Sequence, residues 1–208
     1  MAGSPQQREW IDGFLFVGNH LALDFVNTKP ILEGKARELL SNPMALEKWL
    51  TVSGVVMSQE GRALVRIWRD SRKAENFLRE LVRFRERLLG AILRIESGRA
   101  PGEDFLAEVN ELLSRHPQHV RVVRQGSQVV REVRFEPRNP SDVWAPITAA
   151  TADLLAEVDR TRIRKCESES CVVHFYDTSK KGSRRWCSMN LCGNRSKVAA
   201  YQKRLRQA

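Results

Sequence analysis

The sequence predicts an α+β protein, in which a mostly helical N-terminal domain with a small β-hairpin is followed by a small cysteine-rich module that ends in a basic helix. Three observations predict this fold class. Apolar residues recur at helical spacing along most of residues 42–115, whereas residues 120–135 alternate between apolar and polar side chains. All four cysteines lie in the last fifth of the chain, where basic residues gather around them.

Short elements are expected before the first long helix. Residues 14–17 have the composition of a short strand. Asn19 follows a glycine and is placed to cap a helical turn that carries the apolar residues of 21–25.

Four amphipathic helices are expected next. The first begins at Asn42-Pro43, where a capping side chain precedes a proline at the first helical position. The others follow from apolar residues spaced three and four positions apart, and from the breaks between these runs. The expected helices cover residues 44–52, 58–70, 74–95 and 104–114.

A change of period marks residues 120–135. Two alternating runs flank Gln125-Gly126-Ser127, which predicts a β-hairpin with its turn at this tripeptide. The segment 141–158 then returns to helical spacing, and Pro146 falls in the first turns, where a helix tolerates proline.

The positive charge of the chain is confined to its end. Residues 1–159 hold 22 basic and 22 acidic residues, whereas residues 160–208 hold 13 basic and 3 acidic residues, so the whole net charge of +10 lies in the second segment. This shift predicts two domains with these limits. A basic module attached to a neutral domain favours a polyanionic partner.

The composition also predicts the compartment. No run of eighteen apolar residues is present, and the first residues lack the apolar stretch of a secretory signal, so we expect a cytoplasmic protein with no membrane segment. Thiols stay reduced in that compartment, and clustered reduced thiols favour metal binding over disulfides.

The cysteines have the spacing of a metal site. Cys166, Cys171, Cys187 and Cys192 follow the pattern C-x4-C-x15-C-x4-C. Zn²⁺ prefers four such ligands in a tetrahedron, so one structural zinc ion is predicted, with two disulfides as the alternative. His174 is an alternative ligand, although four cysteines already complete the shell. A complete shell leaves no position for a catalytic water.

The finger that these ligands would hold is expected to be treble-clef-like or ribbon-like. Residues 172–186 are long enough for a hairpin of their own, with residues 172–176 as its first strand. Phe175, Tyr176 and Trp186 would form a minimal core. So small a core needs a metal to fold.

A basic helix is expected after the last cysteine. Gly193 would supply a positive φ, Asn194 would cap the helix, and the apolar face of Val198, Tyr201 and Leu205 would dock on the zinc core. Such a helix is suited to a major groove, although a solvated charged surface is the alternative. The residues predicted to contact nucleic acid are Arg184, Arg185, Arg195, Lys197, Lys203, Arg204 and Arg206.

These motifs resemble a known family. Cys192-Gly193-Asn194-Arg195, together with residues 175–177 and 184–189, is similar to the CGNR zinc finger. Residues 13–28, which include the stretch from His20 to Thr28, are similar to the ABATE (alpha-beta twisted) domain that precedes this finger, and Trp49 fits that domain as well. The resemblance implies a bacterial, stress-induced transcription regulator, with a sensor or ligand domain in front of a DNA-binding finger.

The N-terminal domain offers one candidate ligand pocket. His20, Asp24 and Asn27 fall on one side if their segment is helical, and could bind a small molecule. The alternative is that these side chains satisfy backbone groups or cap a turn. Self-association as a homodimer is a second role for this domain.

No catalytic motif is present, so we expect a protein that is not an enzyme. The sequence hypothesis is a regulator that binds duplex DNA through its finger. The alternatives are a zinc-stabilised protein-interaction module with an acidic partner and an RNA-binding protein.

Overall fold

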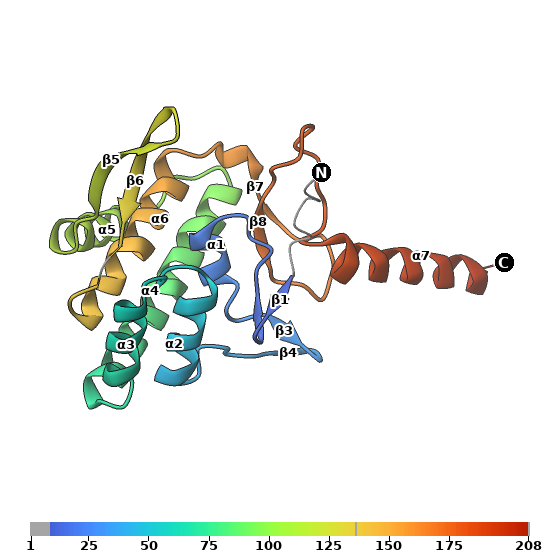
Figure 1. The fold of residues 1–208 in the computed structure, drawn as a ribbon. Coiled ribbons are helices and arrows are strands. Elements are labelled where there is room, and N and C mark those ends of the chain that lie inside the picture. Colours follow the sequence, from blue (N-terminus) through green and yellow to red (C-terminus); the bar gives the residue numbers. More distant parts are fainter. Residues whose placement is uncertain (1–8, 136, 208) are drawn as a thin grey trace. The chain divides into compact units, whose positions relative to one another are not determined.

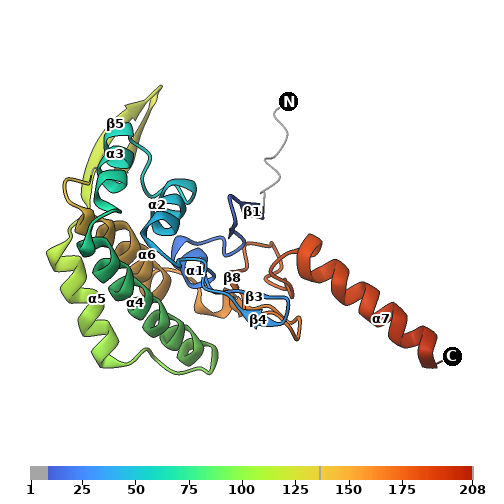
Figure 2. The same ribbon diagram turned by 90° about the horizontal axis from the view of Figure 1, so that it is seen from below.

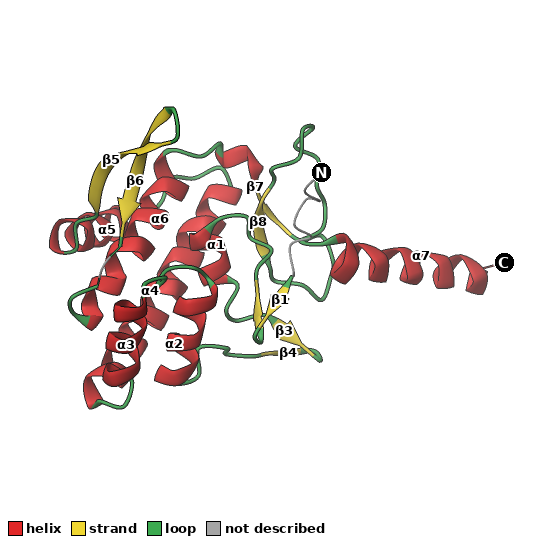
Figure 3. Ribbon diagram, in the orientation of Figure 1, coloured by secondary structure: helices red, strands yellow, loops and turns green. Residues whose placement is uncertain are grey.

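The computed structural model describes residues 9–135 and 137–207, with the side chains of residues 133, 134, 200, 203, 206 and 207 outside the description. Helices dominate, and each described sheet has two strands (Figure 3), which confirms the predicted α+β class. The chain forms two compact units. One joins residues 1–39 to residues 158–208, and the other contains residues 40–157. Within the described residues, no helix combines the length and the apolar character needed to span a bilayer.

The helices of the unit 40–157 begin where the sequence predicts. The side chains of Asn42, Ser58 and Ser71 each accept a hydrogen bond from a backbone N–H of the first turn, so each satisfies a group that the helix itself leaves unpaired. The helices are α2 (Pro43–Val52), α3 (Gln59–Trp68), α4 (Arg72–Glu96), α5 (Glu103–Arg115) and α6 (Trp144–Ala156), the last preceded by the 3-10 turn η1 (Pro140–Val143).

The core of this unit lies along the long helix α4 (Figure 2). The ring of Phe84 packs against Trp144 of α6 at 5.2 Å and against Phe105 of α5 at 5.5 Å between centroids. The contact with Trp144 is edge-to-face, and such ring contacts stabilise the core beyond the apolar area that they bury. Arg85 is also buried on α4, and its guanidinium is paired with Glu86 at 2.8 Å.

The predicted hairpin of this unit is confirmed. Strands β5 (His119–Gln125) and β6 (Gln128–Arg134) pair antiparallel, with Gln125 opposite Gln128. Gly126 has a φ of 62°, whereas Ser127 does not enter the positive-φ region. A glycine at the first central position fits a type II′ turn, whose twist matches that of the strands.

The unit that contains the cysteines begins with short N-terminal elements. They are β1 (Trp10–Ile11), β2 (Phe14–Leu15), α1 (Leu21–Val26), β3 (Ile31–Leu32) and β4 (Lys35–Ala36). The cap of α1 is His20, whose Nδ1 accepts from the N–H of Ala22, so the prediction of Asn19 as the cap was wrong. Asn19 has a φ of 54°, and its side chain turns away from the helix.

The cysteine segment of this unit differs from the prediction in its pairing. It contains η2 (Arg160–Arg162), β7 (Ile163–Lys165), β8 (His174–Tyr176), the π-helical turn η3 (Met189–Gly193) and α7 (Asn194–Gln207). Strand β8 pairs with β7, which precedes the first cysteine, rather than within residues 172–186. The hairpin therefore encloses the first cysteine pair instead of lying between the two pairs.

Candidate metal centre and nucleic-acid interface

Two elements bring the four thiols together (Figure 1). The β7–β8 hairpin holds Cys166 and Cys171 in its connection, and η3, which leads into α7, carries Cys192 soon after Cys187. The four Sγ atoms all lie within 4.8 Å of one another, and the four residues are buried or nearly so. The four cysteines are therefore positioned to bind one metal ion.

The distances between the sulfurs fit zinc. A tetrahedral ion with Zn–S bonds of about 2.3 Å places its sulfurs about 3.8 Å apart. The Sγ of Cys187 lies 3.9 Å from that of Cys171 and 3.5 Å from that of Cys192. A disulfide needs about 2.05 Å, and the four thiols are free. The donor set and its spacing thus favour a metal over the disulfide alternative.

The close contact of the thiols shifts their pKa values in opposite directions. Hydrogen bonds from the thiols of Cys171 and Cys187 lower the pKa of Cys166 to about 2. Hydrogen bonding to Cys166 raises the pKa of Cys171 to about 12 and also raises the pKa of Cys187. A divalent cation removes this difference, because it stabilises thiolates at all its ligands.

Two N–H groups outside the thiols support the cluster. The backbone N–H of Cys187 donates to the Sγ of Cys166 at 3.3 Å. The guanidinium of Arg195 donates to the Sγ of Cys192 at 3.1 Å and to the carbonyl of Leu191 at 2.8 Å. The bond to Cys192 raises the pKa of Arg195. Arg195 therefore fixes the ligand-bearing turn, as outer partners of metal sites do.

The start of α7 corrects two sequence predictions. Gly193 does not have a positive φ; a Cβ there would meet the Sδ of Met189 at 2.7 Å, so a larger residue would require the Met189 side chain to move. Asn194 has helical dihedrals and is not a cap. Ser188 begins the turn instead, since its hydroxyl accepts from the N–H groups of Asn190 and Leu191. The helical path thus starts before the fourth cysteine.

The first residues of the chain form part of this site. The side chain of Asn27 donates to the carbonyl of His174 at 2.8 Å and accepts from its N–H at 2.9 Å, so one buried amide satisfies both backbone groups of a residue on β8. The N–H of Tyr176 donates to the carbonyl of Gly18 at 2.8 Å, and Asn19 donates to the carbonyl of Tyr176 at 3.0 Å. His174 is buried and is not one of the four clustered metal donors.

Apolar packing joins the same segments. Leu15 and Val17 share one buried cluster with the four cysteines and Phe175, and Trp186 packs against it. Of the expected core of Phe175, Tyr176 and Trp186, the cluster includes Phe175 and Trp186 but not Tyr176, and Leu15 and Val17 join it from the N-terminal part of the chain. Glu9 also contributes, because its carboxylate accepts from the hydroxyl of Ser188. The sequence carried no local signal for these contacts.

Each of the three predicted pocket residues contacts the backbone. His20 caps α1, Asn27 holds β8, and the Oδ1 of Asp24 accepts from the N–H of Gly18 at 2.8 Å. These contacts favour the alternative in which the side chains satisfy backbone groups. Burial raises the pKa of Asp24 to about 6, although hydrogen bonds from the backbone lower it in part.

The raised pKa of Asp24 gives a testable pH dependence. The folded-state pKa of about 6 lies above the ordinary value of an aspartate, so folding favours the protonated form, and this stabilisation is lost as pH rises through 6. The free energy of unfolding of Asp24→Asn minus that of the wild type is expected to be about 1 kcal/mol greater at pH 7.5 than at pH 5, because only the wild type loses this stabilisation. Urea unfolding of both proteins at the two pH values measures this difference; a gap that is constant with pH would contradict it.

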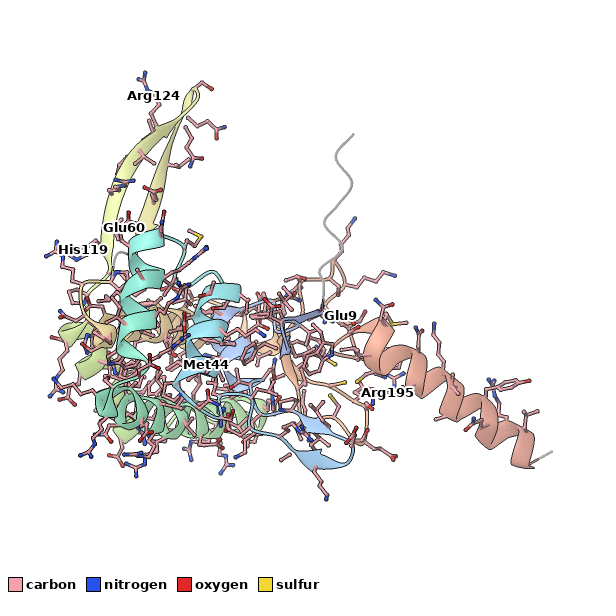
Figure 4. All side chains as sticks on the ribbon, turned by 60° about the horizontal axis from the view of Figure 1, so that its bottom comes forward. Glu9, Met44, Glu60, His119, Arg124 and Arg195 are labelled. Atoms are coloured by element: carbon pink, nitrogen blue, oxygen red, sulfur yellow. The ribbon has the colours of Figure 1, made fainter. Side chains whose placement is uncertain are left out.

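Three of the predicted nucleic-acid residues are engaged within the finger. Arg184 lies over the ring of Phe175 at 4.3 Å and donates to the carbonyls of Trp186 and Cys187, and burial lowers its pKa. Arg185 pairs with Glu167 at 2.5 Å. Arg195 donates to the Sγ of Cys192, and Figure 4 labels it at the start of α7.

The remaining predicted residues lie along α7. Lys197 and Arg204 are exposed, whereas the side chains of Lys203 and Arg206 lie outside the described residues. The apolar face that was expected to dock on the zinc core does not do so. Val198, Tyr201 and Leu205 are 55%, 58% and 60% exposed.

A cavity of about 380 Å³ opens beside the thiols. Trp10, Ile31 and Leu191 supply apolar walls, and Cys171 and Cys187 lie at its base. The hairpin β3–β4 and the strand β1 thus contribute to a space that sequence patterns did not predict, since its walls come from both ends of the chain.

Comparison with known families accounts for nearly the whole chain. Residues 162–205 match the CGNR zinc finger. Residues 19–158 match the ABATE family, whose description is "Putative stress-induced transcription regulator". Neither description names an enzyme, and comparison with curated proteins gives no match. The two matches confirm the resemblance that the sequence motifs indicated, in the same order along the chain. The chain therefore belongs to the ABATE family and carries a CGNR zinc finger after its ABATE region.

Proposed function

We propose that this protein is a bacterial, cytoplasmic transcription regulator that binds duplex DNA through a zinc-held finger, in which Cys166, Cys171, Cys187 and Cys192 hold one structural Zn²⁺. The observation that carries the proposal is the position of α7. This exposed basic helix begins at a turn that contains a metal-ligating cysteine, so the metal would fix its starting point and direction.

Charge supports a polyanionic partner. Residues 194–207 contain five basic residues and no acidic residue. The segment 160–208 has a net charge of +10, and four thiolates on one Zn²⁺ would leave about +8. Phosphate contacts supply most non-specific affinity for DNA, and the major groove is wide enough for a helix.

The engaged arginines narrow the set of contact residues. Arg184 donates to two backbone carbonyls, and Arg195 donates to the Sγ of Cys192. Their guanidinium groups are already engaged, so we assign both the role of positioning residues. Lys197 and Arg204 are exposed and carry the proposed contacts to phosphates. Arg185, paired with exposed Glu167, could exchange that partner for a phosphate.

The family description supports a sensing role for the rest of the chain. We propose that the ABATE region senses a small molecule or mediates self-association during stress. For the small molecule, the cavity beside Cys171 and Cys187 is a better candidate than the backbone-bound His20, Asp24 and Asn27. A ligand there would contact the same turn that directs α7.

One observation favours a second candidate function. The exposed stripe of Val198, Tyr201 and Leu205 on α7 would suit a protein partner with an acidic rim and an apolar groove. RNA is a third polyanion that the basic helix could meet. Binding assays with duplex DNA, single-stranded RNA and the purified protein alone distinguish these partners.

Neutralising α7 tests the proposal. We expect Lys197→Gln/Arg204→Gln to bind a labelled duplex about tenfold more weakly at 0.15 M salt, and to lower the slope of log affinity against log salt by about 2. The matched control Lys35→Gln/Arg37→Gln removes the same charge from exposed positions of the same unit and should leave the slope unchanged. If the two double variants behave alike, the finger does not bind DNA through α7.

A further inference from the structure

Among the described residues, one face of the β5–β6 hairpin carries exposed apolar side chains. Alternation along the strands and the register across them place Val120, Val122 and Val129 on one face together with Arg124 and Arg131. The three valines are 48%, 70% and 69% exposed. We call these five residues the ribbon face. Exposed apolar side chains next to one another on a strand pair indicate a surface that meets a partner.

The opposite face of the same hairpin is different. Val123 and Val130 are half-buried there, and Arg121 forms an ion pair with Glu132 at 2.5 Å. The charge of Arg121 is therefore neutralised across the strands. The contrast shows that exposure of the ribbon face is not a general property of the hairpin.

The charge of the ribbon face selects the class of partner. Arg124 and Arg131 are exposed and, among the described residues, no carboxylate forms an ion pair with either of them. Over residues 119–134 the sequence has four arginines and one glutamate, a net charge of +3, whereas the rest of residues 40–157 has 14 basic and 15 acidic residues, a net charge of −1. Packing this face against a second copy would bring arginines of both copies together, whereas a phosphate backbone would neutralise them.

The dimensions of the hairpin fit a nucleic-acid groove. Each strand has seven residues, so the ribbon is about 24 Å long at about 3.4 Å per residue, and its strands lie about 5 Å apart. The major groove of B-DNA is about 12 Å wide and admits a two-stranded ribbon. The turn at Gly126-Ser127 adds little bulk, and Figure 4 shows Arg124 near this tip, away from the helices of the unit.

We propose that the β5–β6 ribbon is a second duplex-DNA contact, with Arg124 and Arg131 on phosphates and the exposed valines against the apolar edges of bases such as thymine methyl groups. This inference extends the proposed function, which places DNA only on α7. The protein would then contact duplex DNA from each of its two compact units. The ribbon would recognise the phosphates and the groove of the duplex rather than a particular base sequence.

Four full-length proteins test the ribbon. They are the wild type, the ribbon variant Arg124→Gln/Arg131→Gln, the helix variant Lys197→Gln/Arg204→Gln and their combination, each titrated with a labelled 20-bp duplex over a range of salt. We expect the ribbon variant to bind about tenfold more weakly at 0.15 M salt and to lose about 2 from the salt slope, with further loss in the combination. Arg124→Lys/Arg131→Lys keeps the charge and should retain most of the slope.

A control variant and the pattern of losses distinguish failure of the ribbon contact from failure of the α7 contact. Lys73→Gln/Arg83→Gln removes two exposed charges from α4 of the same unit and should behave as the wild type. An unchanged slope in the ribbon variant, with a loss in the helix variant, would overturn the ribbon contact alone. The reverse result would overturn the role of α7 and support the ribbon. An unchanged slope with an altered mass in sedimentation would assign the ribbon face to self-association, and failure of the wild type to bind duplex would overturn both contacts.

Discussion

Replacing Cys187 by serine is expected to release the metal and to unfold the segment around the cysteines. Cys187 is central to the site, since its Sγ lies within 3.9 Å of two other ligand sulfurs and its residue is 1% exposed. A serine hydroxyl is a poor ligand for zinc at neutral pH. The free energy with which structural zinc binds small fingers, about 10–16 kcal/mol, is largely folding free energy.

Elemental analysis measures this first prediction. We expect close to one zinc per wild-type chain and far less than one in Cys187→Ser, with loss of amide protection in β7 and β8. Ser170→Ala is the matched control, because Ser170 is exposed in the connection between the first two ligands. A wild-type protein that is metal-free and disulfide-bonded would refute the zinc site.

The second large effect is expected far from the cysteines in sequence. Asn27→Leu keeps the approximate size of the side chain but removes its hydrogen bonds to both backbone groups of His174, a residue 147 positions away. Each buried group left without a partner costs about 1–3 kcal/mol, so we expect a loss of about 2–5 kcal/mol in free energy of unfolding. Because β8 follows directly from the second ligand, the metal should also leave faster.

Urea unfolding and the rate of zinc transfer to a chelator measure this effect. We expect Asn27→Leu to transfer zinc at least tenfold faster than the wild type. Asn110→Leu is a suitable control, since Asn110 is exposed on α5 in the other unit. Equal transfer rates for Asn27→Leu and the wild type would show that the N-terminal segment does not support the metal site.

Features that depend on local sequence were predictable. The side chains of Asn42, Ser58 and Ser71 cap helices because capping involves only the next few residues. The four cysteines could be recognised as one site because their spacing alone restricts their chemistry. The β5–β6 hairpin followed from its alternation and its glycine turn.

Features that depend on contacts distant in sequence were not predictable. Strand β8 pairs with β7 rather than with later residues, and no local pattern distinguishes these partners. Arg184 carries the same charge as the exposed arginines, yet packing over Phe175 draws it into the finger. The apolar stripe on α7 has the spacing of a packed helix face, although Val198 and its neighbours are exposed.

The division into compact units also depends on contacts between residues that are distant in sequence. The family matches divide the chain between residues 158 and 162. Compactness divides it differently, since residues 1–39 share a unit with the finger. The N-terminal segment is thus continuous with the ABATE region in sequence and with the finger in contacts.

The salt dependence of duplex binding, compared between the wild type and Cys187→Ser, tests the central claim most directly. The claim is that a metal-held finger presents α7 to DNA. We predict that the wild type binds with a steep salt slope, and that Cys187→Ser retains only the part contributed by the β5–β6 ribbon. Equal affinity and equal slope for the two proteins would contradict the account, because they would show that DNA binding does not need the metal site.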